Sequence, residues 1–191
     1  MLRISLDLIN SSTFIMANLY PYKGISPTID SSTFTAPSAD IIGDVAIGKE
    51  CSIWFNTTIR GDVNEIRIGD QTSIQDNTVI HVARKGQGTY VGNRVTVGHG
   101  VILHACTIED DVVVGNGSCV MDDCYVEKGA IVAANALIPP GKRVGSGEVW
   151  AGNPAKKLRD VKAAEVEFFK ENMLDYCVLA KDYQKELEKD K

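Results

Sequence analysis

Three histidines, His81, His99 and His104, are the residues of this 191-residue chain best suited to chemistry. A neutral imidazole can bind a transition metal or serve as a general base near neutral pH. Three imidazoles on one zinc ion would leave a fourth coordination position open, as in catalytic rather than structural zinc sites. Whether the three can share one metal depends on the elements that carry them.

An aliphatic residue returns at almost every sixth position between residues 29 and 144. This period fits neither an amphipathic helix nor an ordinary sheet strand. It fits a short strand that buries a small residue and an aliphatic residue two places later, before the chain turns a corner. With three faces per turn, the repeat predicts an all-β solenoid, a parallel β-helix of about six triangular coils.

The repeat also predicts which polar residues stack on one another. His81 follows the inward Ile80 and His104 follows the inward Leu103, so both side chains point outward. If the insertion at residues 83–90 replaces a single corner, His104 lies one coil beyond His81, about 4.8 Å away. Counting backwards through the repeat places Arg60 in the same column, one coil before His81.

His99 lies outside that column, at a corner, and Asp76 has the same offset one coil earlier. Outward side chains diverge around a prism, so one chain cannot easily bring three imidazoles within about 2.1 Å of one metal. A second copy could supply the third ligand if copies close into a ring around a threefold axis. Arg60 would then face Asp76 in a charge-assisted pair across the interface, with Asp62 holding Arg60 from its own chain. The alternative for Arg60 and Asp62 is a solvated corner that contributes little to stability.

The composition restricts the classes of partner. The net charge of −5 and the pI near 5.2, with no basic stripe, disfavour nucleic acid and anionic membranes as partners. No apolar run approaches the ~20 residues of a membrane span. Five cysteines without a CxxC motif indicate a reducing compartment, so a cytoplasmic location is expected.

Three regions are expected along the chain. Residues 1–19 lack the features of a signal peptide and are predicted to be a poorly ordered extension. Residues 20–153 form the β-helix domain with an irregular lead-in, and residues 154–191 form the C-terminal helix. From about Asp160 to Lys189 the spacing of apolar residues predicts one amphipathic helix, packed along the coil or on a neighbouring subunit.

Trp54 and Phe55 interrupt the polar outer face of the coil and are expected to pack against a neighbouring chain.

The polar positions of the repeat resemble those of a known family. The matching segments are Ile59-Arg60-Gly61-Asp62, Ile74-Gln75-Asp76-Asn77 with His81, Val97-Gly98-His99 through His104, and Trp150 through Lys156. They are similar to the γ-class carbonic anhydrase-like family of hexapeptide-repeat, left-handed β-helix proteins. The resemblance implies a left-handed coil and a homotrimer with zinc, or iron or cobalt, bound between subunits.

The resemblance also implies roles for individual residues. It assigns metal ligation to His81, His99 and His104 and the interfacial pair to Arg60 and Asp76. It further implies that Asp62 supports this pair and that Gln75 lies near metal-bound water. The implied activity is that of a carbonate dehydratase-like lyase, in which zinc-bound hydroxide hydrates carbon dioxide to bicarbonate.

The chain departs from the family's archetype in one respect. The archetype carries an acidic loop and a glutamate after its Arg-x-Asp, which move the released proton. Here the loop at residues 83–89 is short and basic, and Val63 follows Asp62, so a low activity is expected.

Three alternative functions remain, because a fold does not decide function. They are a hexapeptide-repeat acyltransferase that uses acetyl-CoA and a metal-free histidine base, a thioesterase, and a non-catalytic metal-binding protein.

Overall fold

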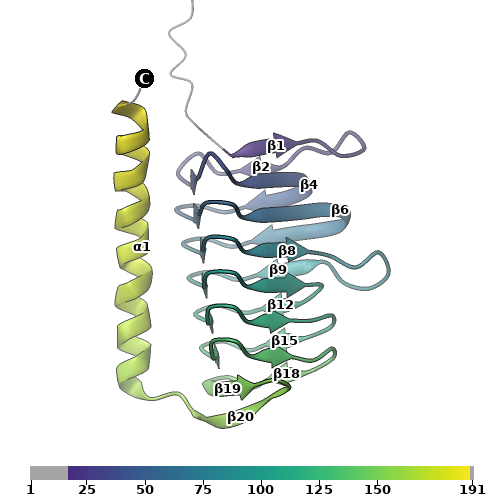
Figure 1. The fold of residues 1–191 in the computed structure, drawn as a ribbon, viewed down its shortest axis with the longest axis vertical. Coiled ribbons are helices and arrows are strands. Elements are labelled where there is room, and N and C mark those ends of the chain that lie inside the picture. Colours follow the sequence, from purple (N-terminus) through teal and green to yellow (C-terminus); the bar gives the residue numbers. More distant parts are fainter. Residues whose placement is uncertain (1–16, 190–191) are drawn as a thin grey trace, which may run out of the picture.

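The computed structural model describes residues 17–189 of the chain. They form a parallel β-solenoid of about seven turns, with a single C-terminal helix lying along one side (Figure 1). The predicted fold class is confirmed. Within the described residues, no helix combines the length and the apolarity needed to cross a membrane.

Each turn contributes a strand to each of three faces of the solenoid. Face 1 consists of β1 (Asn18–Tyr20), the first parts of β4 (Asp40–Ile47) and β6 (Thr58–Ile68), β8 (Val79–His81), β11 (Ile102–His104), β14 (Cys119–Val120) and β17 (Leu137–Ile138). Face 2 consists of β2 (Thr28–Ile29), the last parts of β4 and β6, β9 (Thr89–Val91), β12 (Thr107–Ile108), β15 (Tyr125–Val126) and β18 (Arg143–Val144). Face 3 consists of β3 (Phe34–Thr35), β5 (Ser52–Ile53), β7 (Ser73–Ile74), β10 (Thr96–Val97), β13 (Val113–Val114), β16 (Ile131–Val132) and β19 (Glu148–Gly152).

The core follows the six-residue repeat. The inward aliphatic residues of face 1 are fully buried, as Ile59, Ile80 and Leu103 illustrate with no exposed surface. Small inward residues turn the corners and bond to the next turn: the Thr72 hydroxyl donates to the Gly92 carbonyl at 2.8 Å, and the Thr78 hydroxyl donates to the Gly98 carbonyl at 3.0 Å. Threonine suits this position because its methyl group fills the core while its hydroxyl group keeps a hydrogen bond.

The solenoid has one turn more than expected, about seven rather than about six. The difference lies at the two ends of the coil, in strands that the count did not include: β1, which pairs in parallel with Asp40–Ile42 of β4, and β19, which pairs in parallel with β16. Both strands lie outside residues 29–144, where the six-residue period holds. The first strand, β1, begins at Asn18, two residues before the expected start of the β-helix domain at residue 20. Of the extension expected over residues 1–19, residues 1–16 lie outside the described part of the chain.

The insertion at residues 83–90 replaces a single corner, as the predicted register requires. β8 ends at His81, and the next strand, β9, already belongs to face 2, where it pairs with β6 and β12. The loop between them projects from the side of the solenoid (Figure 1). The face count used to stack His81 and His104 is therefore confirmed.

The C-terminal region begins with a strand rather than with the helix. β20 (Ala155–Asp160) pairs antiparallel with β19, and α1 (Ala163–Lys189) follows. Residues 154–162 therefore do not belong to the helix. The carboxylate of Glu165 holds the start of α1 by accepting a hydrogen bond from the Lys162 backbone amide at 2.9 Å and two from Arg159, each at 2.7 Å.

The apolar face of α1 packs on face 3, against β3, β5 and β7. Trp54 is only 4% exposed and lies between Phe34 and the Tyr176 and Tyr183 rings of α1, with ring centroids 5.3 to 5.7 Å away. Phe55 also contacts Tyr183. The expectation that Trp54 and Phe55 pack against a neighbouring chain is therefore wrong, because the chain's own helix returns to cover them.

Candidate functional site

The predicted histidine column lies on face 1. β8 and β11 pair so that His104 stands opposite His81, and β6 pairs with β8 so that Ile59 stands opposite Ile80. Arg60, directly after Ile59, therefore occupies the turn before His81. The regular strand spacing brings these side chains together although they are far apart in sequence.

Two ring nitrogens of this column face each other. His81 Nδ1 and His104 Nε2 are 3.2 Å apart, with ring centroids 5.2 Å apart. Two ligands of a tetrahedral zinc ion with bonds of about 2.1 Å are separated by about 3.4 Å. The spacing of the two nitrogens therefore suits a single metal ion.

The other ring nitrogen of each histidine is bonded to a carboxylate. His81 Nε2 lies 3.0 Å from Asp62 Oδ1, and His104 Nδ1 lies 2.6 Å from Asp122 Oδ1. An ionised carboxylate can only accept, so the imidazole must donate in both bonds. In a neutral imidazole the remaining nitrogen then carries a lone pair. The two facing nitrogens, His81 Nδ1 and His104 Nε2, can thus each offer a lone pair, and this donor set fits a cation.

Asp62 links this pair to Arg60. Its carboxylate accepts a hydrogen bond from the Arg60 guanidinium as well as from His81. Burial by itself raises the pKa of Asp62, but the hydrogen bonds from His81 and Arg60 outweigh it and hold the pKa below the usual range. The carboxylate is therefore ionised at neutral pH. The predicted support of Arg60 by Asp62 is present within the chain.

His99 lies at the corner between face 3 and face 1 and pairs with Asp76. Its Nδ1 is 2.9 Å from Asp76 Oδ2, and the Phe55 backbone amide donates to the other oxygen of Asp76 at 3.2 Å. The stacking of His99 on Asp76, one turn apart, follows the predicted register. Within the described chain the Asp76 carboxylate contacts His99, and a pairing with Arg60 would require a second copy.

The structure does not bring the three histidines together in one chain. Across residues 17–189, no three histidine, cysteine, aspartate or glutamate side chains are arranged to hold a metal ion. His81 and His104 converge on face 1, whereas His99 lies apart from them, at the corner between face 3 and face 1. This agrees with the expectation that one chain cannot use all three.

Gln75 lies with His99 rather than with the histidine pair. Its side chain is 4% exposed and lines a groove between face 3 and α1, together with His99, Phe169 and Tyr176. The amide is therefore on the side of the chain that the corner histidine occupies.

Asp122 is the one member of this arrangement that the sequence analysis missed. Val120 occupies the position after Leu103 in the inward column of face 1, and Asp122 follows it by two residues. A search for acidic residues one turn beyond His104 would have found it. Its role rests on a side-chain contact, which the repeat alone does not predict.

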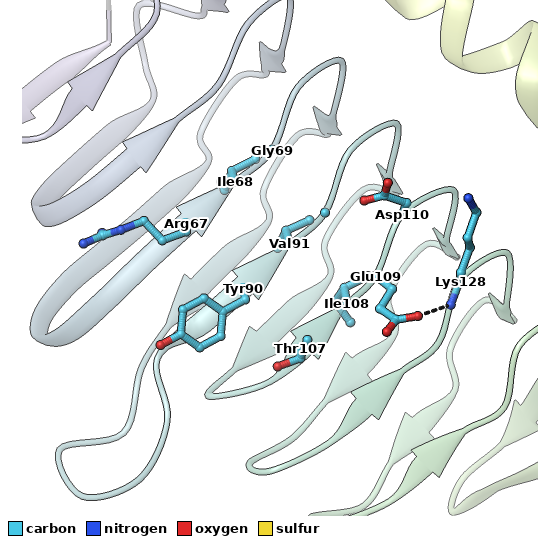
Figure 2. A pocket seen from close by; sticks show the side chains of 11 residues that line it. Arg67, Ile68, Gly69, Tyr90, Val91, Thr107, Ile108, Glu109, Asp110 and Lys128 are labelled. Atoms are coloured by element: carbon cyan, nitrogen blue, oxygen red, sulfur yellow. Dashed lines mark hydrogen bonds between the residues drawn. The ribbon is translucent and has the colours of Figure 1, made fainter.

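A separate shallow pocket lies on face 2 and contains none of the predicted site residues. Arg67, Tyr90, Thr107, Glu109 and Lys128 line it (Figure 2). Its polar groups are paired: the Tyr90 hydroxyl donates to Glu65 at 2.8 Å, which raises the pKa of Tyr90, and Arg67 also binds Glu65. The Lys128 backbone amide donates to Glu109 at 2.8 Å. These internal pairs leave the face 2 pocket without a clear ligand chemistry.

Comparison with known proteins identifies the family. Residues 105–140 match the model for the bacterial transferase hexapeptide (six repeats). Gamma carbonic anhydrase 2, mitochondrial, of Arabidopsis thaliana is 46% identical over 166 residues, which are 84% of this chain and 60% of that protein. A carbonic anhydrase of Geobacillus kaustophilus is 38% identical and is matched over 78% of this chain and 81% of its own length.

A solved structure agrees with these relatives. A hexapeptide transferase family protein from Anaplasma phagocytophilum is 48% identical and has a TM-score of 0.84, over 87% of this chain and 98% of that one. The chain spans only 60% of the length of the Arabidopsis relative. The repeat, the histidine positions and these matches together show that the chain belongs to the γ-carbonic anhydrase-like hexapeptide-repeat family.

Proposed function

We propose that this protein hydrates carbon dioxide reversibly to bicarbonate at metal sites shared between the subunits of a homotrimer. His81 and His104 of one copy and His99 of the next would hold zinc, or iron or cobalt. The observation that carries the proposal is the pair of facing ring nitrogens 3.2 Å apart, each on a histidine whose other nitrogen contacts a carboxylate, with the third histidine at another corner. The relatives named carbonic anhydrase support it.

The residues of the chain have distinct parts in this proposal. A bound zinc ion would lower the pKa of its water ligand to about 7 and so make hydroxide available at neutral pH. Asp62 contacts His81 and orients its ring. It also pairs with Arg60 and holds that side chain on the surface that a second copy would meet. Arg60 would reach Asp76 of that copy, and Gln75 of the copy would approach the site with His99. The proton released by hydration must then leave for solvent.

The test is metal analysis of anaerobically purified protein followed by stopped-flow measurement of carbon dioxide hydration. We expect about one metal ion per chain and hydration that disappears in His104→Ala. The control is Asp123→Asn, an exposed position without a ligand role, which should retain both metal and activity. Metal-replete protein without any hydration would refute the proposal.

A second candidate function, acyl transfer, is favoured by the environment of His99. Its Nδ1 is held by Asp76, its side chain is 47% exposed, and its Nε2 has no hydrogen bond among the described residues. A histidine oriented in this way can act as a general base. The 48% identical structure is named a hexapeptide transferase family protein. Acetyl-CoA binding and acetyl transfer by metal-free protein, with the transfer lost in His99→Ala, would support this function over hydration.

A further inference from the structure

We infer that Asp122 is a positioning residue that selects the tautomer of His104 and thereby keeps a metal-binding nitrogen available. The inference deepens the proposed function and rests on it for the identity of the ligand, a divalent metal ion. Asp122 Oδ1 lies 2.6 Å from His104 Nδ1. This bond places the proton on Nδ1 and leaves the lone pair on Nε2, which faces His81.

The competing state is a hydrogen bond between the two rings. If the proton of His104 moved to Nε2, that nitrogen would donate to His81 Nδ1, which is 3.2 Å away. Both facing nitrogens would then be occupied, and a metal ion would have to break the bond before it could bind. Asp62 holds His81 with a lone pair on Nδ1, so it does not prevent this state. Only a constraint on His104 can prevent it, and Asp122 supplies that constraint.

Among the described residues, no other charged side chain competes with His104 for the carboxylate of Asp122. Among the described residues, no lysine or arginine pairs with it, and its one ion-pair partner is His104. Its backbone carbonyl accepts a hydrogen bond from the Gly141 amide at 2.8 Å, which ties it to the following turn. Asp62 and Asp122 therefore stand at opposite ends of the histidine pair along face 1.

The next residue provides a matched control. Asp123 is exposed and has no side-chain hydrogen bond among the described residues. Its φ is 58°, a left-handed conformation that asparagine also adopts readily. Asp123→Asn therefore makes the same change of charge as Asp122→Asn, one residue away, without touching His104.

The first measurement uses metal-free full-length protein. Long-range ¹H–¹⁵N correlation spectra resolve the tautomers of its three histidines, at a pH where the imidazoles are neutral. We expect the Nδ1–H form of His104 in the unaltered protein and in Asp123→Asn, and a gain of the Nε2–H form in Asp122→Asn. An Nε2–H form in the unaltered protein would overturn the inference, whether or not any variant folds.

The second measurement is a titration of the protein with Zn²⁺ and with Co²⁺. Calorimetry monitors the binding, and the visible spectrum also monitors the binding of cobalt. Loss of such a carboxylate typically weakens metal binding about 10- to 100-fold, so Asp122→Asn should raise Kd by that factor while Asp123→Asn should not. Unchanged Kd and an unchanged tautomer in folded Asp122→Asn would refute the inference. If the unaltered protein binds neither metal, the proposed function fails, while the tautomer measurement still decides the role of Asp122.

Discussion

At the scale of single residues, each of the three histidines is held by its own carboxylate. Asp62 holds His81, Asp76 holds His99 and Asp122 holds His104. Such outer carboxylates fix the ring orientation and increase the basicity of the nitrogen that binds metal. In the proposed function these carboxylates would orient all three imidazoles for metal binding, although only His81 and His104 converge within one copy.

Asp62→Asn should weaken metal binding because it loosens His81. The expected increase in the Kd for Zn²⁺ is about 10- to 100-fold, the usual effect of losing a carboxylate that orients a ligand. Titration calorimetry measures it. Asp44→Asn is the control, because Asp44 pairs with Arg67 away from the histidines. Equal affinities in the two variants would show that Asp62 does not support His81.

At the scale of elements, α1 is attached to the solenoid at two places. Its aromatic side chains cover Trp54 on face 3, and Glu165 anchors its first turn to Arg159. The aromatic contacts depend on apolar burial, whereas the ionic contact depends on pH. The two attachments can therefore be tested separately.

Trp54→Ala should destabilise the protein by about 3 to 5 kcal/mol, because it removes a large buried side chain. Urea unfolding measures the change, and hydrogen exchange should show faster exchange of the α1 amides than of the coil amides. Phe168→Ala is the comparison, since Phe168 lies on the same helix but is 59% exposed. A similar loss at both positions would mean that the cluster around Trp54 does not hold the helix.

Acidification should release the first turn of α1. The hydrogen bonds from Arg159, with those of the Lys162 amide, lower the pKa of Glu165 from 4.5 to about 2. A lowered folded-state pKa means that the stabilisation is present above the unfolded value and is lost as pH falls toward the folded value. The stability difference between the unaltered protein and Glu165→Gln should thus be constant above about pH 5.5 and shrink between about pH 4.5 and 2. Denaturant unfolding at several pH values measures it, and a difference that grows on acidification would contradict the ionic role.

The loop between β8 and β9 should make proton export slow. It follows His81 directly and carries Arg84 and Lys85 but no carboxylate. If proton transfer to solvent limits turnover, small buffers such as imidazole should raise kcat and leave kcat/KM nearly unchanged, since they act after the chemical step. Stopped-flow hydration over a series of buffer concentrations tests this. A kcat independent of buffer would indicate a proton route that the loop does not supply.

At the scale of the whole molecule, the site is complete only if copies assemble. The histidine pair on face 1 and the corner bearing His99 are different surfaces of one chain, and the proposed ring of three copies would bring them together at every interface. The proposed chemistry therefore depends on the proposed trimer.

Mixed trimers test this arrangement. His81→Ala and His99→Ala should each lose the metal when alone, because every interface lacks one ligand. Refolding the two in equal amounts should restore about a quarter of the sites, since each mixed ring contains one interface in which both surfaces are intact. Metal content after refolding measures this. The absence of recovery in verified mixed trimers would mean that all ligands come from one chain.

The sequence alone determined the architecture and the stacking of the site residues. The period of six sets the face on which each residue lies, so His104 above His81, Arg60 before them, and His99 above Asp76 could all be counted from the chain. Counting works because every turn repeats the same hydrogen-bonded spacing, and a slip of one residue would turn the aliphatic core outward. The strands β1 and β19 were missed because they lie outside the part of the chain that keeps this period.

Only the tertiary structure decided the contacts between side chains. It showed which nitrogen of each ring faces its neighbour, that Asp122 holds His104, and that α1 rather than another chain covers Trp54. A repeat specifies the position of the backbone, but rotamers and the docking of a distant helix depend on packing between residues that no local pattern relates. For this reason the column of histidines was predictable, and the selection of their tautomers was not.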